Sequence, residues 1–285
     1  MKRILILVVL VALAGIAGVV VRSSSSKGGT VAELRELVSQ NAEDAVRDEI
    51  RQSYELAPGA RVEVAGINGA VKIETADTKT AEIYIERNAS CKEALDRRKI
   101  LIDGSADRLS IRGETVEHSF FAKLFGSRAS EKVTLKLPRQ IALAAKGVNG
   151  AVVIGEIEGP VELSGVNGKV NVAKATGSAT FKGINGNIFA AMKSLEQDGV
   201  TLSGINGNIE LQLPADVNAD LDARGMNGRV IAELPNVSMD KSKHGSYWAR
   251  IGNGGTGITA KGINGNIRLT TATPPSPPTT ATTLN

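Results

Sequence analysis

Residues that usually carry chemistry are scarce in this chain. Its 285 residues include one cysteine, two histidines and one tryptophan, and aromatic residues make up 3%. The single cysteine, Cys91, excludes an internal disulfide bond. His118 and His244 have no Cys or Asp partner at the spacing of a zinc site, so no metal and no cofactor are expected.

Charge is nearly balanced. The net charge is +4, and lysine and arginine are scattered along the sequence. Because aromatic residues for base stacking are also scarce, the composition gives no support for nucleic-acid binding. Glu156, Glu158, Glu162 and Glu210 lie at outward positions of expected strands, as any solvated face would supply, so we assign no catalytic residues.

Glycine, in contrast, is abundant, and many of the 31 glycines belong to one motif. Seven times the chain has Gly, then Ile, Val or Met, then Asn-Gly, at intervals of 18 or 21 residues from the second to the sixth copy. Repetition at so short a period predicts a repeat architecture. The Asn-Gly pairs are Asn68 and Gly69, Asn149 and Gly150, Asn167 and Gly168, Asn185 and Gly186, Asn206 and Gly207, Asn227 and Gly228, and Asn264 and Gly265.

Apolar residues around these copies follow a fixed order of spacings of two, three and four residues. A gap of two is typical of a strand with one buried face, and the longer gaps indicate turns between short strands. We therefore expect nine-residue units, two to each repeat. Between Gly150 and Gly186 the expected inward residues are Val152, Ile154, Ile157, Val161, Leu163, Val166, Val170, Val172, Ala175, Ala179, Phe181 and Ile184.

This pattern predicts an all-β fold, a single-stranded β-solenoid or β-helix-like stack with 18–21-residue repeats. A sandwich built from hairpins is the alternative, because Asn-Gly is also a hairpin turn. The seven Asn-Gly pairs are expected to be structural turns. Gly enters the left-handed region without a Cβ penalty, and Asn tolerates that region better than other residues. We also expect the Asn side chains to stack and to bond the backbone of neighbouring repeats.

Residues 1–22 indicate a signal peptide or an N-terminal transmembrane anchor. Lys2 and Arg3 precede an unbroken apolar run over residues 4–21, which would be about 27 Å long as a helix. Ala12 and Ala14 provide a small-residue cleavage motif, so cleavage and retention both stay open. Either outcome predicts export, to the extracytoplasmic side of the cytoplasmic membrane if anchored or into the medium if cleaved.

Residues 23–53 are expected to form a linker and then a short helix, because the apolar residues from Val31 onward follow helical spacing. We expect this helix to cap the repeats, and a stalk or a short coiled-coil seam is the alternative. The Pro- and Thr-rich residues 271–285 predict a disordered tail.

The repeat is interrupted over residues 78–146 by alternating strands and a short helix, expected over residues 90–98. This region also holds a Phe-rich segment, residues 118–125. This segment is interpreted either as a loop packed over the repeats or as an exposed apolar patch that binds a partner.

Over residues 54–270 the order of elements resembles a bacterial family of putative adhesins, a domain of unknown function found in envelope proteins. The matching elements are the run from Tyr54 to Val64, the first Gly-x-Asn-Gly, the strand Ile83 to Arg87, the helix before Lys99, the strand Leu109 to Arg112, the strand Val133 to Pro138 and the Asn-Gly ladder. The resemblance implies a β-solenoid outside the cytoplasmic membrane, with an adhesive role and no established catalytic residues.

We therefore expect a non-catalytic, envelope-associated binding module, an adhesin or envelope sensor that presents a repetitive surface to an envelope protein or glycan. A structural scaffold or filament is the alternative, since stacked repeats can associate end to end. A polysaccharide-active enzyme is less favoured, because the paired carboxylates Glu156 and Glu158 are weak evidence for a catalytic site.

Overall fold

A computed structural model describes residues 46–115, 129–195, 198–243 and 245–271. The expected membrane segment, the linker, the Phe-rich segment, the tail and both histidines lie outside these residues. Within the described ranges, no helix is long and apolar enough to span a membrane.

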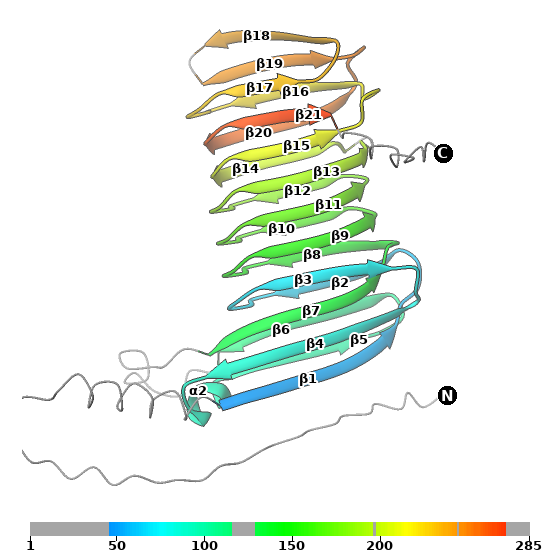
Figure 1. Cartoon of the computed structure of the whole chain (residues 1–285), viewed down its shortest axis with the longest axis vertical. Helices are drawn as coiled ribbons and strands as arrows, with labels where there is room; N and C mark the ends of the chain where they lie inside the picture. Colours follow the sequence, from blue (N-terminus) through cyan, green and yellow to red (C-terminus); the bar gives the residue numbers. More distant parts are fainter. Residues whose placement is uncertain (1–45, 116–128, 196–197, 244, 272–285) are drawn as a thin grey trace, which may run out of the picture.

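The described chain forms two large β-sheets that face one another in a tall stack (Figure 1). The ten strands of the first sheet are, in spatial order, β1 (Val46–Glu55), β4 (Thr80–Ala89), β7 (Ser130–Pro138), β3 (Val71–Ala76), β9 (Val152–Glu158), β11 (Val170–Thr176), β13 (Ile188–Ser194), β15 (Ile209–Leu213), β21 (Ile267–Thr271) and β17 (Val230–Glu233). The eleven strands of the second sheet are β5 (Arg98–Gly104), β6 (Arg108–Thr115), β2 (Ala60–Ala65), β8 (Ile141–Lys146), β10 (Val161–Ser164), β12 (Ala179–Lys182), β14 (Val200–Asn206), β20 (Thr256–Asn264), β16 (Ala219–Arg224), β19 (Ser246–Ile251) and β18 (Val237–Lys243).

The nine-residue unit corresponds to one strand. Strands β9, β10, β11 and β12 begin at Val152, Val161, Val170 and Ala179, and they alternate between the two sheets. The chain crosses from one sheet to the other where the apolar spacing lengthens. All twelve inward residues expected between Gly150 and Gly186 are at most 2% exposed, so the predicted core is confirmed.

The single-stranded β-solenoid is wrong, although the all-β class stands. Each repeat gives one strand to each of two large sheets, and the sheets are mixed and do not close into a solenoid. Neighbouring strands are parallel in the centre, for example β9 and β11, but antiparallel at both ends, for example β1 with β4 and β16 with β19. The repeat period alone cannot predict strand direction, because parallel and antiparallel strands of the same length show the same spacing of apolar residues.

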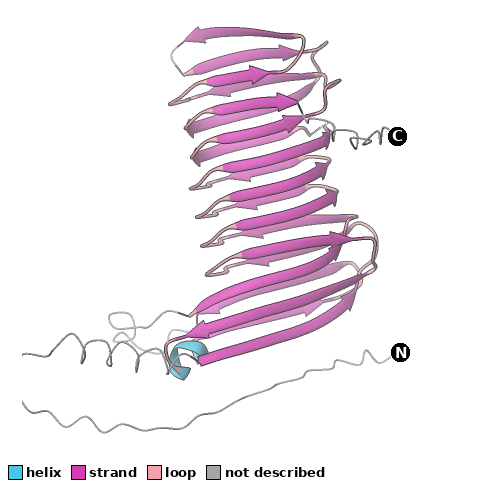
Figure 2. Ribbon diagram, in the orientation of Figure 1, coloured by secondary structure: helices cyan, strands magenta, loops and turns pink. Residues whose placement is uncertain are grey.

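The capping helix expected before residue 54 is also wrong where the structure describes it. Residues 46–55 form β1, which pairs with β4 over ten consecutive residues. Ile50 and Tyr54 are four residues apart, a spacing that suits one face of a helix or of a strand, and long-range pairing decides between the two. The helix expected over residues 90–98 is confirmed as α2 (Lys92–Asp96), the one helix of the described chain (Figure 2).

The two interruptions of the repeat build the two ends of the stack. Strands β4 to β7 lie outside β2 and β3 and, with β1, form the N-terminal end. At the other end, β18 and β19 extend the second sheet, and the last repeat, β20 and β21, returns to lie between β14–β15 and β16–β17. Spatial order therefore differs from chain order at both ends.

Each corner depends on the two glycines of the motif. In the turn of residues 204–207, Gly204 has φ 62°, which is left-handed. A Cβ on Gly207 would lie 2.3 Å from the carbonyl oxygen of Gly186 in the repeat below. Two repeats can stack at strand spacing here only because this position carries no side chain.

We predict that Gly207→Ala lowers the free energy of unfolding by about 2 kcal/mol or more, because the added methyl group must displace backbone. Gly257→Ala is the matched control, since a Cβ there meets no heavy atom within 4 Å. Chemical denaturation of both variants measures the difference. Equal stability of the two variants would contradict the close approach at Gly207.

Candidate functional site

The seven motif asparagines lie in one row along the edge of the stack. In the spatial order of the row, the side-chain amide of each Asn after Asn68 donates to the side-chain oxygen of the Asn before it, at distances of 2.9 to 3.1 Å. In spatial order the ladder is Asn68, Asn149, Asn167, Asn185, Asn206, Asn264 and Asn227. The bonds therefore join side chain to side chain, rather than side chain to backbone as expected.

The left-handed residue of each corner is the first glycine of the motif and not the asparagine. Gly66, Gly147, Gly165, Gly183, Gly204, Gly225 and Gly262 have φ values from 61° to 66°. Among the described residues other than glycine, Asn236 alone has a positive φ. The asparagines are thus selected for their amide groups, which both donate and accept.

The N-terminal end of the ladder is closed by a buried ion pair. The amide of Asn68 donates to the carbonyl oxygen of Ala129 at 2.7 Å, and its backbone N–H donates to Oε2 of Glu131 at 2.8 Å. The Glu131 side chain is fully buried, and its carboxylate is held by Arg98, with Nη2 to Oε2 at 3.1 Å. Arg98 also donates to the carbonyl oxygen of Gly66. Glu131 and Arg98 thus take the place of a further repeat.

The outer face of the second sheet carries a row of cations, which we call the basic row: Arg112, Lys146, Lys182, Lys261 and Arg224. Ala65, Ser164 and Ser203 occupy the intervening strands, opposite their basic neighbours in the register. Since neighbouring strands are about 4.8 Å apart, cations that are two strands apart are spaced roughly 10 Å.

The two central lysines of the basic row have no carboxylate partner. No ion pair in the described part of the chain involves Lys182 or Lys261, and both side chains are exposed. Lys146, in contrast, lies 4.0 Å from Glu162, and Arg224 lies 2.7 Å from Asp222. The hydrogen bonds to that carboxylate raise the pKa of Arg224 above its usual value. The centre of the row is therefore the part most available to an anion.

A second row of polar residues runs beside the basic row. Thr180, Thr201 and Thr259 are direct register neighbours, followed by Asp222 and Trp248. Trp248 is 39% exposed, and the guanidinium of Arg250 lies 5.2 Å from the centroid of its ring. Hydroxyl groups and one exposed indole are suited to a hydroxylated ligand.

The same face is hollowed beside the basic row. A depression of about 360 Å³ forms where the small side chains of Ala142 and Ala144 lie between Arg61 and Glu162. Thr180 and Lys182 line its other side. Both polar rows thus border one hollow.

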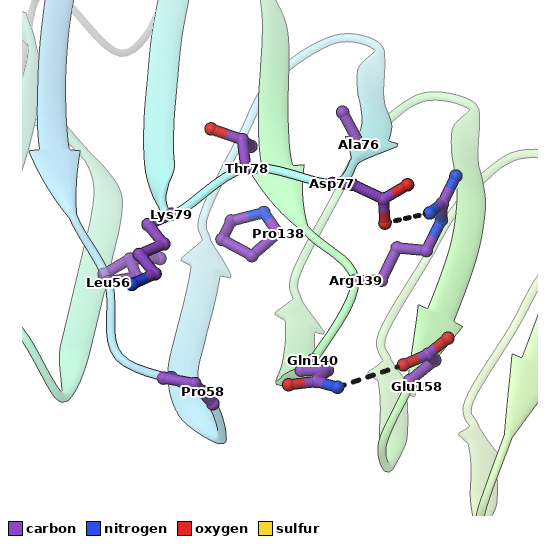
Figure 3. A pocket seen from close by; sticks show the side chains of 10 residues that line it. All are labelled: Leu56, Pro58, Ala76, Asp77, Thr78, Lys79, Pro138, Arg139, Gln140 and Glu158. Atoms are coloured by element: carbon purple, nitrogen blue, oxygen red, sulfur yellow. Dashed lines mark hydrogen bonds and ion pairs between the residues drawn. The ribbon is translucent and has the colours of Figure 1, made fainter.

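Another hollow, of about 400 Å³, lies at a corner between the sheets (Figure 3). Among its lining residues Arg139 forms an ion pair with Asp77, and the Gln140 amide donates to Glu158 at 3.4 Å. Glu156 also faces cations, since Arg139 and Lys174 each lie 3.7 Å from its carboxylate. These carboxylates are bound by cations and amides and do not face one another as an acid–base pair.

Metal-ligating side chains do not gather in the part of the chain that the structure describes, where no three or more His, Cys, Asp or Glu residues converge. Cys91 is half-buried and precedes α2, where Val46 and Leu95 belong to the same apolar cluster.

The sequence contained a signal for the basic row that we missed. Every residue of the row except Arg112 immediately precedes a copy of the motif, at Lys146, Lys182, Arg224 and Lys261. Scattered lysines in the sequence become aligned only when the repeats are stacked in register.

Comparison with known proteins assigns no family. No family model and no curated protein match the chain. Among solved structures, it is similar to a putative cell adhesion protein from Clostridium sporogenes, with 11% identity and a TM-score of 0.40, over 80% of this chain and 100% of that one. It is also similar to a putative adhesin from Parabacteroides merdae, with 12% identity and a TM-score of 0.27, over 78% and 95%. A putative lipid binding protein from Parabacteroides distasonis matches with 12% identity and a TM-score of 0.23, over 79% and 95%. These likenesses are too distant to assign a function.

We predict that Asn185→Val lowers the free energy of unfolding by about 1–2 kcal/mol, because two ladder bonds are lost, those to Asn167 and Asn206. Asn171→Val is the control, since that exposed Asn makes no side-chain hydrogen bond within the described residues. Urea unfolding of both variants measures the effect. A loss no larger than that of the control would show that the ladder contributes nothing.

We predict a larger loss, about 3 kcal/mol or more, for Glu131→Ala, because Arg98 would stay largely buried without its counter-charge. Glu82→Ala removes an exposed ion pair with Lys136 at the same end of the stack and is expected to cost less than about 1 kcal/mol. Thermal and chemical unfolding compare the two. Similar losses in both variants would contradict the closing role of Glu131.

Proposed function

We propose that this chain is a non-catalytic binding module of the bacterial cell envelope, an adhesin or envelope sensor on the outer side of the cytoplasmic membrane, and that the outer face of the second sheet is its binding surface. The observation that supports this most directly is the basic row, whose cations recur on one line across the sheet with the threonines beside them.

The chemistry of this face favours an extended, anionic and hydroxylated ligand, such as an acidic envelope glycan. Lys182 and Lys261 supply charge and form no ion pair within the described residues, and Thr180, Thr201 and Thr259 supply hydroxyl groups. Each exposed contact contributes little alone. Several contacts along one chain add together, because the first contact raises the effective concentration for the next.

We predict that the full chain, held in detergent, binds polygalacturonate and does not bind neutral dextran. Exchanging three cations of the basic row, Lys146→Glu, Lys182→Glu and Lys261→Glu, should weaken binding to polygalacturonate by roughly tenfold or more. Binding should also fall as salt is raised, since exposed charges are screened. Biolayer interferometry at two ionic strengths measures both effects.

The matched control carries the same exchange on the outer face of the first sheet, at Lys72, Lys132 and Lys136. It has the same net charge as the test variant but an intact basic row. Equal loss of binding in both triple variants would contradict a binding surface on the second sheet and would indicate attraction to net charge alone.

A further inference from the structure

The first sheet ends at its N-terminal side in a long open edge. Strand β1 pairs with β4 on one side, and within the described residues no strand pairs with its other side. Its ten residues contain no proline, and the register with β4 is unbroken from Val46 to Glu55. Edge strands in monomeric proteins are usually short, bulged or covered, because an open row of N–H and C=O groups is a template for another strand.

The side chains of β1 are self-complementary in an antiparallel arrangement. If Ile50 lies opposite Ile50 of a second copy, then Glu49 lies opposite Arg51 of that copy, and Arg51 opposite its Glu49. Both side chains are on the exposed face, at 53% and 70% exposure. Opposite charges that face one another across a strand pair are stabilising.

The inward side chains of β1 match in the same register. Asp48 lies opposite Gln52 of the second copy. The Gln52 side-chain oxygen accepts a hydrogen bond from the Tyr54 hydroxyl at 2.8 Å, so its NH₂ group is the part left to donate. Asp48 is acceptor-only as a carboxylate, and it already bonds Arg87 on one side. The pair therefore joins a donor to an acceptor.

The second sheet ends at the same side in β5, whose side chains are also self-complementary in an antiparallel pair. Leu101 is at the middle of β5 and is 45% exposed, although it is a large apolar residue. With Leu101 opposite Leu101 of a second copy, Lys99 lies opposite Asp103, and Ile100 lies opposite Ile102. Both the charged and the apolar residues are again paired with suitable partners.

One two-fold axis can serve both edges. β1 and β5 both begin near α2, since Val46 packs in one apolar cluster with Leu95. Towards their other ends, the Tyr54 ring lies against Gly104. Ile50 is four residues before Tyr54, and Leu101 is three residues before Gly104. The midpoints of the two expected strand pairs therefore differ by one residue along the strands, or about 3.3 Å, so one axis can pass close to both.

The opposite end of the stack lacks such edges. β17 is only four residues long, and the register of β18 with β19 shifts between Asp240 and Lys243. A short edge and a bulged edge both oppose further pairing. Association through the N-terminal end alone closes after two copies, because the interface is used up on both.

We propose that a second copy of this chain pairs with the N-terminal end, β1 with β1 and β5 with β5, to form a closed two-fold dimer in which both sheets are continuous. Isologous pairing of this kind explains why the longest open edge of the described residues is regular and of alternating charge. The dimer does not depend on which ligand the outer face binds.

The test uses charge exchange in the full chain, with association measured by sedimentation equilibrium in density-matched detergent. Glu49→Arg places arginine opposite Arg51 of the second copy, and Arg51→Glu places glutamate opposite Glu49. Each variant alone should dimerise roughly tenfold more weakly than the wild type. An equimolar mixture of the two should recover wild-type affinity, because every opposed pair in the mixed dimer is again of opposite charge.

Glu74→Arg and Lys72→Glu are the matched controls, since they alter a similar exposed ion pair, 2.6 Å apart, on the internal strand β3. They should leave dimerisation unchanged. A monomeric wild type, a dimer that Glu49→Arg does not weaken, a mixture that does not recover, or polymers that lengthen with concentration would each overturn the proposal. The second of these outcomes would place the contact elsewhere, for example in residues 1–45.

Discussion

The whole architecture depends on how closely the backbones of successive repeats approach at the Asn-Gly corners. A Cβ on Gly168, Gly186, Gly207 or Gly265 would lie 2.2 to 2.4 Å from the carbonyl oxygen of the glycine in the adjacent repeat. No side chain fits in that space, so stacking at strand spacing requires glycine at this position. The asparagine before it then comes within hydrogen-bond reach of the next asparagine. A one-residue slip would break both contacts at every level at once, and the corners therefore fix the register.

A fixed register has a consequence for the surface. Because the residue before each motif occupies the same place in every repeat, its side chain always lies on the same line of the second sheet's outer face. The structural repeat thus places Lys146, Lys182 and Lys261 in one row, although the repeated Gly-x-Asn-Gly motif does not itself specify a binding site. The two properties are separable, since the glycines and asparagines set the line and the preceding residues set its charge.

The core was predictable from the sequence because it depends on local spacing alone. Inward residues such as Val152 and Ile154 of β9 are two positions apart within one strand, and burial follows wherever that face of the strand packs. The two-sheet arrangement was not predictable, since a nine-residue unit does not show whether the next strand joins the same sheet. Likewise, Asn264 lies between two asparagines of the ladder. It bonds Asn227, the preceding copy in the sequence, and also Asn206, which is 58 residues earlier. The basic row was missed for the same reason, because its alignment exists only between repeats.

The ends of the stack determine what the repeats can do together. Two copies joined through β1 and β5 would have continuous second sheets, so both basic rows would lie on one uninterrupted face. A polymer that bridges the two rows gains from effective concentration, since its second contact is intramolecular. The gain requires no new contact within either row, only a ligand long enough to cross the joined N-terminal ends. Dimerisation would thus support weak repetitive binding, because it places two basic rows on one face within reach of one polymer.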